Sequence, residues 1–274
     1  MPIQPPAVSR FIKMHGLGND FVIFDHRYDP LEITAERASR LADRRLGVGC
    51  DQIIQILPPA DDGPPAMAEM RIFNADGSRA EMCGNAARCV AHYLRNNMGL
   101  PKETLTLQTL AGLIQIQPRD NGLESVQMGR PETGQPGEFI TTALGRRYQF
   151  TEVSMGNPHC VIFLPELAGF PVEEEGPALE THPRFPHRTN VEFVQVLDSK
   201  TIRMRVWERG AGVTPACGTG ACAAAVAAIL NGHTTQRQVR VCLDGGDLDI
   251  VWRPDDQVIM TGPATESFHG EIIF

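Results

Sequence analysis

The sequence predicts a mixed helix-and-strand protein that is built from two similar domains. Strand-like and helix-like segments alternate from Phe11 onwards, and 274 residues suffice for one large domain or two of ordinary size. Hydrophobic residues make up 42% of the chain and charged residues 21%, so a packed core is expected and wholesale disorder is excluded. Two internal matches indicate the duplication.

The first match couples a strand-like segment to a cysteine. Met70–Phe73 is followed after nine residues by Cys83, and Met204–Trp207 is followed after nine residues by Cys217, an offset of 134 (217 − 83). A glycine and an alanine-rich helical segment come after each cysteine. Each half of the chain is therefore expected to contain a strand–loop–Cys–helix unit.

The second match lies upstream of the first in both halves. Asn19 followed by Val22–Phe24 resembles Asn157 followed by Val161–Phe163, at an offset of 138 (157 − 19) with one extra residue before the later valine. Two ordered matches near one offset are much rarer than single four-letter matches. We therefore infer two similar domains.

Local patterns predict the individual elements. Strands are expected at 21–24, 51–57 and 69–74, helices at 34–45 and 84–97, and further strands after residue 104. Thr34 can cap the first helix, Gly47 can end it, and Gly99 and Pro101 can end the second. Proline and glycine predict a tail at 1–9, loops at 58–66 and 176–189, and a linker at 129–137.

The composition of the chain indicates which kinds of molecule it is expected to bind. The formal charge of −8 and the absence of a Lys/Arg run disfavour a nucleic-acid partner. The first ten residues form no apolar leader, and the uncharged run Ala221–Leu230 is too short to cross a membrane. Seven cysteines are too few for a disulfide scaffold. We expect a cytoplasmic protein with reduced thiols that acts on a small molecule.

Cys83 and Cys217 are expected where a loop meets a helix N-terminus. Unpaired backbone N–H groups there bind carboxylates and lower a thiol pKa below its free value of about 8.5. Gly84 and Gly218 let a ligand approach the backbone closely. The other cysteines are expected to be small packing residues, which describes Cys50, Cys89, Cys160, Cys222 and Cys242.

Two thiols in two similar domains suggest one substrate that carries a carboxylate. One thiolate would remove the α-proton and the other thiol would deliver a proton to the opposite face, which racemises or epimerises the carbon. Helix N-termini would stabilise the enolate-like charge. No glycine-rich nucleotide fingerprint is present, so no cofactor is required.

These residues alone leave other kinds of site open. A redox-active cysteine pair would be expected to form a CxxC motif, which the sequence lacks. A zinc site would need paired ligands at the usual spacing, which are also missing. A Cys-His hydrolase, with His159 beside Cys83, is a serious alternative. Near the second match, Arg209 can hold a carboxylate bidentately and Glu208 can pair with an ammonium or a thiol.

Five motifs resemble the diaminopimelate epimerase family, whose members interconvert LL- and meso-diaminopimelate without a cofactor. The motifs are HGLGNDFV at 15–22, GCDQ at 49–52, FNADGSRAEMCGNAARC at 73–89, GNPHCV at 156–161 and WERGAGVTPACGTGAC at 207–222. The resemblance implies an α+β fold of two pseudo-symmetric domains, each a mixed or antiparallel sheet around a central helix, with a cleft between them. The expected domains are 10–128, joined by a final strand at 264–274, and 129–263.

The resemblance also implies roles for individual residues. Cys83 and Cys217 are the expected acid/base pair, assisted by His159 and Glu208 respectively. Backbone donors to the reacting carboxylate are expected at Gly84, Asn85, Gly218 and Thr219. The implied substrate-binding side chains are Asn19, Gln52, Asn74, Asn157, Asn190, Glu208 and Arg209.

Two departures from the family pattern stand out. Ala86 replaces a glycine that often follows CGN, with little effect expected because the donors lie at 84 and 85. Phe268 stands near a C-terminal tyrosine that is linked with dimers, so a homodimer is expected without that hydroxyl. Proline racemases are the nearest alternative, but their substrate would leave Arg209 and several asparagines unpaired.

Overall fold

The polypeptide folds into two compact units. The computed structural model describes residues 8–29, 31–60, 66–97, 99 and 104–273, so the predicted tail at 1–9, the loop at 58–66 and Pro101 lie partly or wholly outside these ranges. Unit 1 comprises residues 1–126 with 263–274, and unit 2 comprises residues 127–262. The sequence placed the corresponding boundaries after residues 128 and 263.

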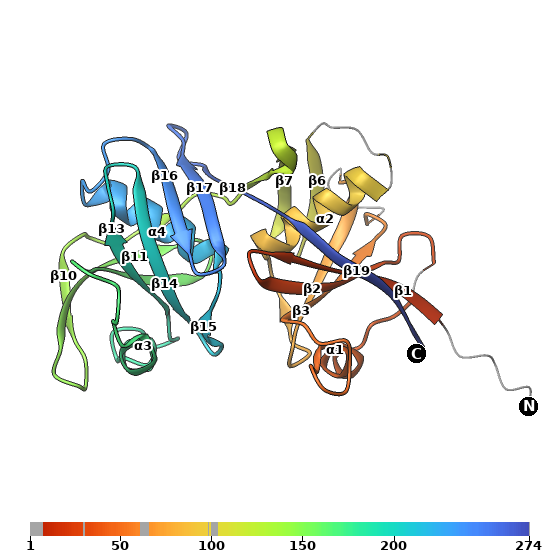
Figure 1. Ribbon diagram of the computed structural model, residues 1–274, viewed down its shortest axis with the longest axis horizontal. Coiled ribbons are helices and arrows are strands. Elements are labelled where there is room, and N and C mark those ends of the chain that lie inside the picture. Colours follow the sequence, from red (N-terminus) through yellow and green to blue (C-terminus); the bar gives the residue numbers. More distant parts are fainter. Residues whose placement is uncertain (1–7, 30, 61–65, 98, 100–103, 274) are drawn as a thin grey trace, which may run out of the picture. The chain divides into compact units, whose positions relative to one another are not determined.

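In unit 1, a mixed sheet curves around one central helix (Figure 1). The helices of this unit are α1 (Ala35–Ala42) and α2 (Gly84–Asn97), with a short 3-10 turn at Asp120–Gly122. Its strands are β1 (Val8–Gly16), β2 (Asn19–Asp25), β3 (Gln52–Leu57), β4 (Ala68–Asn74), β5 (Arg79–Ala80), β6 (Leu105–Thr109), β7 (Gly112–Pro118), β8 (Glu124–Gln127) and β19 (Thr265–Ile273).

Unit 2 repeats this arrangement. Its helices are α3 (Val172–Glu180) and α4 (Gly218–Leu230). Its strands are β9 (Glu132–Thr133), β10 (Glu138–Thr141), β11 (Arg147–Ser154), β12 (Pro158–Phe163), β13 (Asn190–Val196), β14 (Thr201–Glu208), β15 (Gly212–Thr214), β16 (Gln238–Leu243), β17 (Gly246–Trp252) and β18 (Val258–Gly262).

Strand pairing follows the same order in the two units. In unit 1, β2 and β3 are parallel, β3 and β4 antiparallel, and β4 and β6 parallel. In unit 2, β12 and β13 are parallel, β13 and β14 antiparallel, and β14 and β16 parallel. The predicted α+β fold of two pseudo-symmetric domains is therefore confirmed. The C-terminal strand β19 pairs with β1, as the family resemblance implies.

The central helices are buried where small residues are concentrated in their sequences. Every residue from Gly220 to Ala228 in α4 is buried. Every residue from Ala86 to Ala91 in α2 is also buried. A helix that is apolar on all sides is stable only inside a core, and alanines let the strands approach closely. The outer helices α1 and α3 pack on β3–β4 and β13–β14 respectively, over separate hydrophobic clusters.

The register of the strands corrects the second internal match. Phe21 pairs with Gln52 at the start of β2–β3, and His159 pairs with Asn190 at the start of β12–β13. This register gives a single offset of 138 (159 − 21 and 190 − 52). The extra residue inferred from the Val-Ile-Phe letters is therefore wrong, since those letters lie one position out of register.

Three predicted segments also differ from the structure. Helix α1 ends at Ala42 rather than residue 45, because the Asp43 carboxylate accepts bonds from the N–H groups of Arg45 and Leu46 and starts a turn. The predicted linker at 129–137 contains β9, which pairs with β11 inside unit 2. The predicted loop at 176–189 begins within α3, which accommodates Pro177.

Candidate active site

Both matched cysteines lie at the N-terminal ends of the central helices, as the sequence predicts. The carbonyl of Cys83 accepts a hydrogen bond from Ala87 N at 2.9 Å, and the carbonyl of Cys217 accepts one from Ala221 N at 2.9 Å. Cys217 caps α4 with an extended backbone, and its Sγ accepts a bond from Gly220 N at 3.4 Å. Each thiol therefore lies beside the unpaired N–H groups of a helix start.

In unit 1, Asn19 connects Cys83 to the strands. Its Oδ1 accepts hydrogen bonds from Asn85 Nδ2 at 3.2 Å and from the Cys83 thiol at 3.9 Å. Its Nδ2 donates to Asp51 Oδ2 at 2.9 Å, which fixes the orientation of the amide. Two polar residues of the predicted set are thus held beside the thiol by a carboxylate that the sequence did not single out.

Gln52 and Asn74 form a second pair in unit 1. They are register partners on β3 and β4, and Gln52 Nε2 donates to Asn74 Oδ1 at 3.0 Å. Asn74 also donates to Ser78 Oγ at 3.0 Å. Within the described part of the chain no donor reaches the buried Oε1 of Gln52. That oxygen therefore has an unused acceptor position.

In unit 2, a chain of hydrogen bonds starts at the second thiol. Cys217 Sγ lies 3.6 Å from Thr219 Oγ1, which accepts a bond from Asn157 Nδ2 at 3.2 Å. Asn157 Oδ1 lies 3.0 Å from His159 Nε2, and His159 Nδ1 lies 2.7 Å from Glu192 Oε1. The predicted residues Asn157, His159, Cys217 and Thr219 are therefore connected within one unit.

Glu208 is the last residue of β14 and lies next to this chain of hydrogen bonds. Burial raises the pKa of its carboxyl, against hydrogen bonds from Thr214 and Cys217 and the proximity of His159, which favour the charged form. A carboxyl with a raised pKa is closer in acidity to a thiol, which favours proton exchange between the two groups.

The Cys217 thiol corrects one electrostatic expectation. Its pKa is raised well above its usual range, because burial and the carboxylates of Glu208 and Glu192 outweigh the bonds from Thr219 and Gly220. Helix position alone therefore does not make Cys217 a thiolate in this structure.

Asn190 and Arg209 lie at neighbouring strand ends. Asn190 Nδ2 donates to Pro158 O at 2.9 Å, and its Oδ1 accepts from Arg209 N at 2.9 Å. The Arg209 side chain is exposed, with one guanidinium nitrogen 3.4 Å from His187 O. Asn190 therefore fixes the backbone beside Glu208, while the Arg209 guanidinium extends towards solvent.

The remaining thiols are packing residues. The side chains of Cys50, Cys89, Cys160 and Cys222 are buried and that of Cys242 is half-buried. The seven cysteines, all of which lie in the described ranges, form no disulfide. Burial raises the pKa of Cys50 and of Cys89 to about 12. Across the described ranges there is no His/Cys/Asp/Glu cluster suited to a metal ion, and no helix long and apolar enough to span a membrane.

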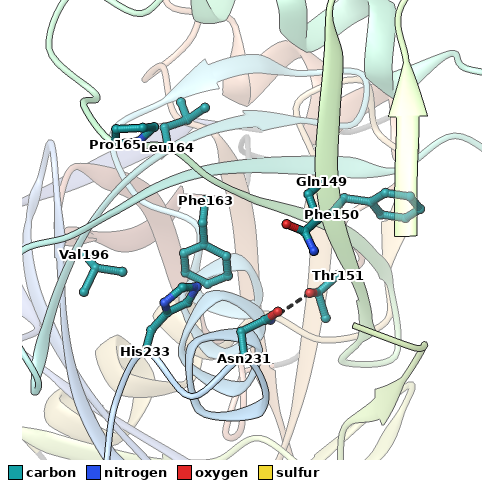
Figure 2. Close-up of a pocket in the computed structure, with 9 residues that line it drawn as sticks. All are labelled: Gln149, Phe150, Thr151, Phe163, Leu164, Pro165, Val196, Asn231 and His233. Carbon is teal, nitrogen blue, oxygen red and sulfur yellow. Dashed lines mark hydrogen bonds between the residues drawn. The ribbon is translucent and has the colours of Figure 1, made fainter. Parts of the chain in front are cut away.

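A cavity in unit 2 lies away from this chemistry. It has a volume of about 400 Å³, and Asn231 donates a hydrogen bond to Thr151 across it at 2.8 Å (Figure 2). Asn231 and His233 follow the C-terminus of α4, whereas Cys217 precedes its N-terminus. The helix between them spans about 20 Å at 1.5 Å per residue. The cavity therefore does not include the matched thiol.

Comparison with known proteins assigns the family. The model of the family described as diaminopimelate epimerase matches residues 11–134 and 151–266. The chain belongs to the diaminopimelate epimerase family. A diaminopimelate epimerase of Magnetococcus marinus is 52% identical over 275 residues, which cover 97% of each chain. One from Pelotomaculum thermopropionicum is 48% identical over 279 residues, which cover 95% of this chain and 98% of the relative.

Solved structures support the fold of the diaminopimelate epimerase family. A PhzF-family phenazine biosynthesis protein of Bacillus anthracis aligns with a TM-score of 0.76 at 17% identity, covering 98% of this chain and all of the other. A hydroxyproline epimerase of Agrobacterium vitis aligns with a TM-score of 0.73 at 16% identity, covering 97% and 93%. At these identities the likeness establishes the fold alone.

Sequence reasoning missed Glu192 and Asp51 among the polar residues around the thiols. Glu192 is fully buried and contacts His159, and Asp51 orients Asn19. A signal for Glu192 is present in the sequence, because it is the one acidic residue in the strand NVEFVQV. A lone carboxylate in a buried strand requires a partner.

Proposed function

We propose that this protein interconverts LL- and meso-diaminopimelate by two-base proton transfer at the α-carbon. Cys83 and Cys217 act from opposite faces, one as the base and the other as the acid, and no cofactor takes part. The observation that carries the proposal is the repeated placement of a cysteine at the start of each central helix, in a chain of the diaminopimelate epimerase family.

Roles for the other groups are those that the family resemblance implies, and the contacts of Glu208 support its part. His159 assists proton transfer at Cys83, and Glu208 assists at Cys217, to which it is hydrogen-bonded. The backbone N–H groups at the two helix starts bind the reacting carboxylate, where the helix dipole stabilises the charge that develops on proton removal. These donors are at Gly84, Asn85, Gly218 and Thr219.

The polar side chains suit a substrate with two charged ends. Arg209 is exposed and can reach a carboxylate, and amide groups can hydrogen-bond to both ammonium and carboxylate groups. We assign substrate binding to Asn19, Gln52, Asn74, Asn157, Asn190, Glu208 and Arg209. An amino acid with one charged end would leave several of these groups unpaired.

The cellular setting is also part of the proposal. The reaction belongs to lysine and cell-wall precursor biosynthesis, and the enzyme works in the cytoplasm, where thiols stay reduced. We further propose a homodimer. Phe268 on β19 is 49% exposed and packs edge-on against Phe11, so an apolar ring is available on that strand.

The test is incubation of the purified protein in D2O with LL-diaminopimelate and, separately, with L-proline, without pyridoxal phosphate. Stereochemical interconversion and deuterium uptake are expected with the first substrate only. Cys83→Ala and Cys217→Ala should each abolish interconversion, because one face loses its acid/base group. Turnover of proline alone, or full activity in either variant, would contradict the proposal.

A cysteine-to-serine variant tests the assignment of faces. Serine is a much weaker acid than cysteine, so Cys83→Ser should retain slow proton exchange on one face only. Deuterium should then wash into one stereoisomer faster than into the other. Equal uptake from both stereoisomers would show that the two thiols do not serve separate faces.

A further inference from the structure

Glu192 is a fully buried carboxylate that contacts an imidazole rather than a surface cation. Its Oε1 lies 2.7 Å from His159 Nδ1, and both side chains have no solvent exposure. No donor in the described part of the chain reaches its Oε2. Burying a carboxylate with one oxygen unpaired destabilises the folded state, so its presence needs a reason beyond packing.

Unit 1 demonstrates that the fold does not require this pair. The shared strand register aligns His159 with Phe21 and Glu192 with Ile54, since Ile54 pairs with Ile72 and Glu192 pairs with Val206 at the same offset of 134 (206 − 72). Phe21 and Ile54 are as fully buried as the polar pair. The same chain therefore fills these positions with apolar residues in one unit and with ionisable residues in the other.

The contacts of His159 specify its protonation. Nδ1 faces the carboxylate of Glu192, and Nε2 faces the amide oxygen Oδ1 of Asn157, whose Nδ2 is engaged with Thr219. An oxygen therefore faces each ring nitrogen, and a ring that donates from both nitrogens, and so carries a positive charge, satisfies both oxygens. The carboxylate of Glu192 compensates that charge.

The first turn of helix α4 packs against the Glu192 carboxylate. A Cβ placed on Gly220 would lie 2.7 Å from Glu192 Oε1 and 3.2 Å from Cys217 Sγ, so the carboxylate lies directly beneath the first turn of the helix. The ionisable groups that interact with the pair are Glu208 from β14, Cys217 from the start of α4, and Cys160 from β12.

We propose that Glu192 is a positioning residue: its carboxylate keeps both ring nitrogens of His159 protonated and thereby sets the hydrogen-bond chain that reaches Cys217. With Nε2 donating, Asn157 must turn its oxygen to the ring and its NH₂ to Thr219. The Thr219 hydroxyl hydrogen is then free to point at the thiol. The role in turnover rests on the proposed epimerase function, whereas the protonation of His159 does not.

The experiment compares wild type with Glu192→Gln and a matched control. Glu175→Gln also neutralises a fully buried carboxylate of unit 2, but Glu175 belongs to the outer helix α3 and pairs with Arg146. Nitrogen NMR of histidine-labelled protein, assigned with His159→Asn, reports which ring nitrogens carry protons. Steady-state kinetics with LL-diaminopimelate are measured across neutral pH.

Two protonated nitrogens are expected in the wild type and in Glu175→Gln, and one in Glu192→Gln. The kcat of Glu192→Gln should fall about 10- to 100-fold with KM changed less than about 2-fold, as for other partners that orient a functional histidine. Glu192→Asp, which keeps the charge, should restore the second proton and part of the activity.

Three results would overturn the proposal. They are a singly protonated His159 in the wild type, an unchanged ring in Glu192→Gln, or equal kcat losses in Glu192→Gln and Glu175→Gln. If Glu192→Gln fails to fold, the wild-type spectrum and Glu192→Asp still decide the question. A doubly protonated ring in a protein that does not turn over diaminopimelate would reject the proposed function and retain the Glu192–His159 pair.

Discussion

Gly220 in helix α4 lies directly over the carboxylate of Glu192. A methyl group at residue 220 would meet Glu192 Oε1 at 2.7 Å and Cys217 Sγ at 3.2 Å. The residue of unit 1 that corresponds to Gly220 at the offset of 134 (220 − 86) is Ala86, and the residue that corresponds to Glu192 is Ile54. The glycine is therefore needed for the carboxylate and not for the helix.

We expect Gly220→Ala to reduce both stability and turnover. Alanine normally favours a helix over glycine by about 1 kcal/mol, whereas overpacking here should cost about 1–3 kcal/mol and displace the Cys217 sulfur. Urea denaturation of Gly220→Ala, Glu192→Ala and the double variant measures the coupling. If the clash is real, the double variant is more stable than the sum of the single changes; strict additivity would refute it.

Asp20 anchors a buried ammonium in unit 1. Its carboxylate lies 2.6 Å from Lys13 Nζ and 2.8 Å from Arg44 Nη2, and it accepts a bond from Asp51 N at 2.9 Å. Although burial acts to raise it, the pKa of Asp20 is lowered well below its usual range by the bonds from Arg44 and Lys13. The folded state is therefore stabilised above the pKa of the unfolded carboxyl, and this contribution disappears as pH falls.

Asp20→Asn should destabilise the protein by about 3 kcal/mol at pH 7, because Lys13 is left buried without its carboxylate. The difference from wild type should shrink as pH falls below about 4, where the wild-type carboxyl also begins to lose its advantage. Urea denaturation at several pH values measures both effects. A difference that stays constant down to about pH 2 would show that the charge of Asp20 is not responsible.

The thiols should differ in reactivity towards alkylation. Thiolates are the reactive form, and burial raises the pKa of Cys50 and of Cys89 to about 12. Burial also raises the pKa of Cys160 well above its usual range. Cys83 is only half-buried. Brief treatment of the native protein with iodoacetamide, followed by peptide mass spectrometry, should label Cys83 well before these three. Early labelling of Cys89 or Cys160 would contradict their described burial.

The sequence predicted much of this structure because the fold is duplicated. The alanine-rich segments after Cys83 and Cys217 are helices with buried alanines, and in α4 small apolar residues at nearly every position fit only a helix enclosed by strands. Helix α2 begins and ends where the sequence placed it. By contrast, α3 was missed, because Pro177 and the nearby histidines hide a helix whose apolar face packs on β13 and β14.

The site was harder to predict than the fold, since much of it depends on tertiary contacts. Matching motifs identified Cys83, Cys217 and their neighbours. They gave no sign that Asp51 would orient Asn19, because that bond joins the start of β2 to the start of β3. The raised pKa of Cys217 was likewise unpredictable from helix position, since it arises from burial and from carboxylates on β13 and β14.

Copying the unit 1 residues into unit 2 separates stability from function at the His159–Glu192 pair. His159→Phe alone should destabilise unit 2 by about 3–5 kcal/mol, because it leaves the Glu192 carboxylate buried without a partner. The double variant His159→Phe/Glu192→Ile recreates the Phe21–Ile54 pair and should be as stable as wild type or more so, since apolar residues often replace buried ion pairs without loss. Urea denaturation tests this order of stabilities.

Turnover in these variants should not follow their stability. Both the single and the double variant lack the imidazole, so neither should epimerise diaminopimelate, although the double variant is fully folded. A stable, inactive double variant would establish that unit 2 keeps an ionisable pair for chemistry where unit 1 keeps an apolar pair for packing. A double variant as unstable as His159→Phe would mean instead that unit 2 depends on the pair for its fold.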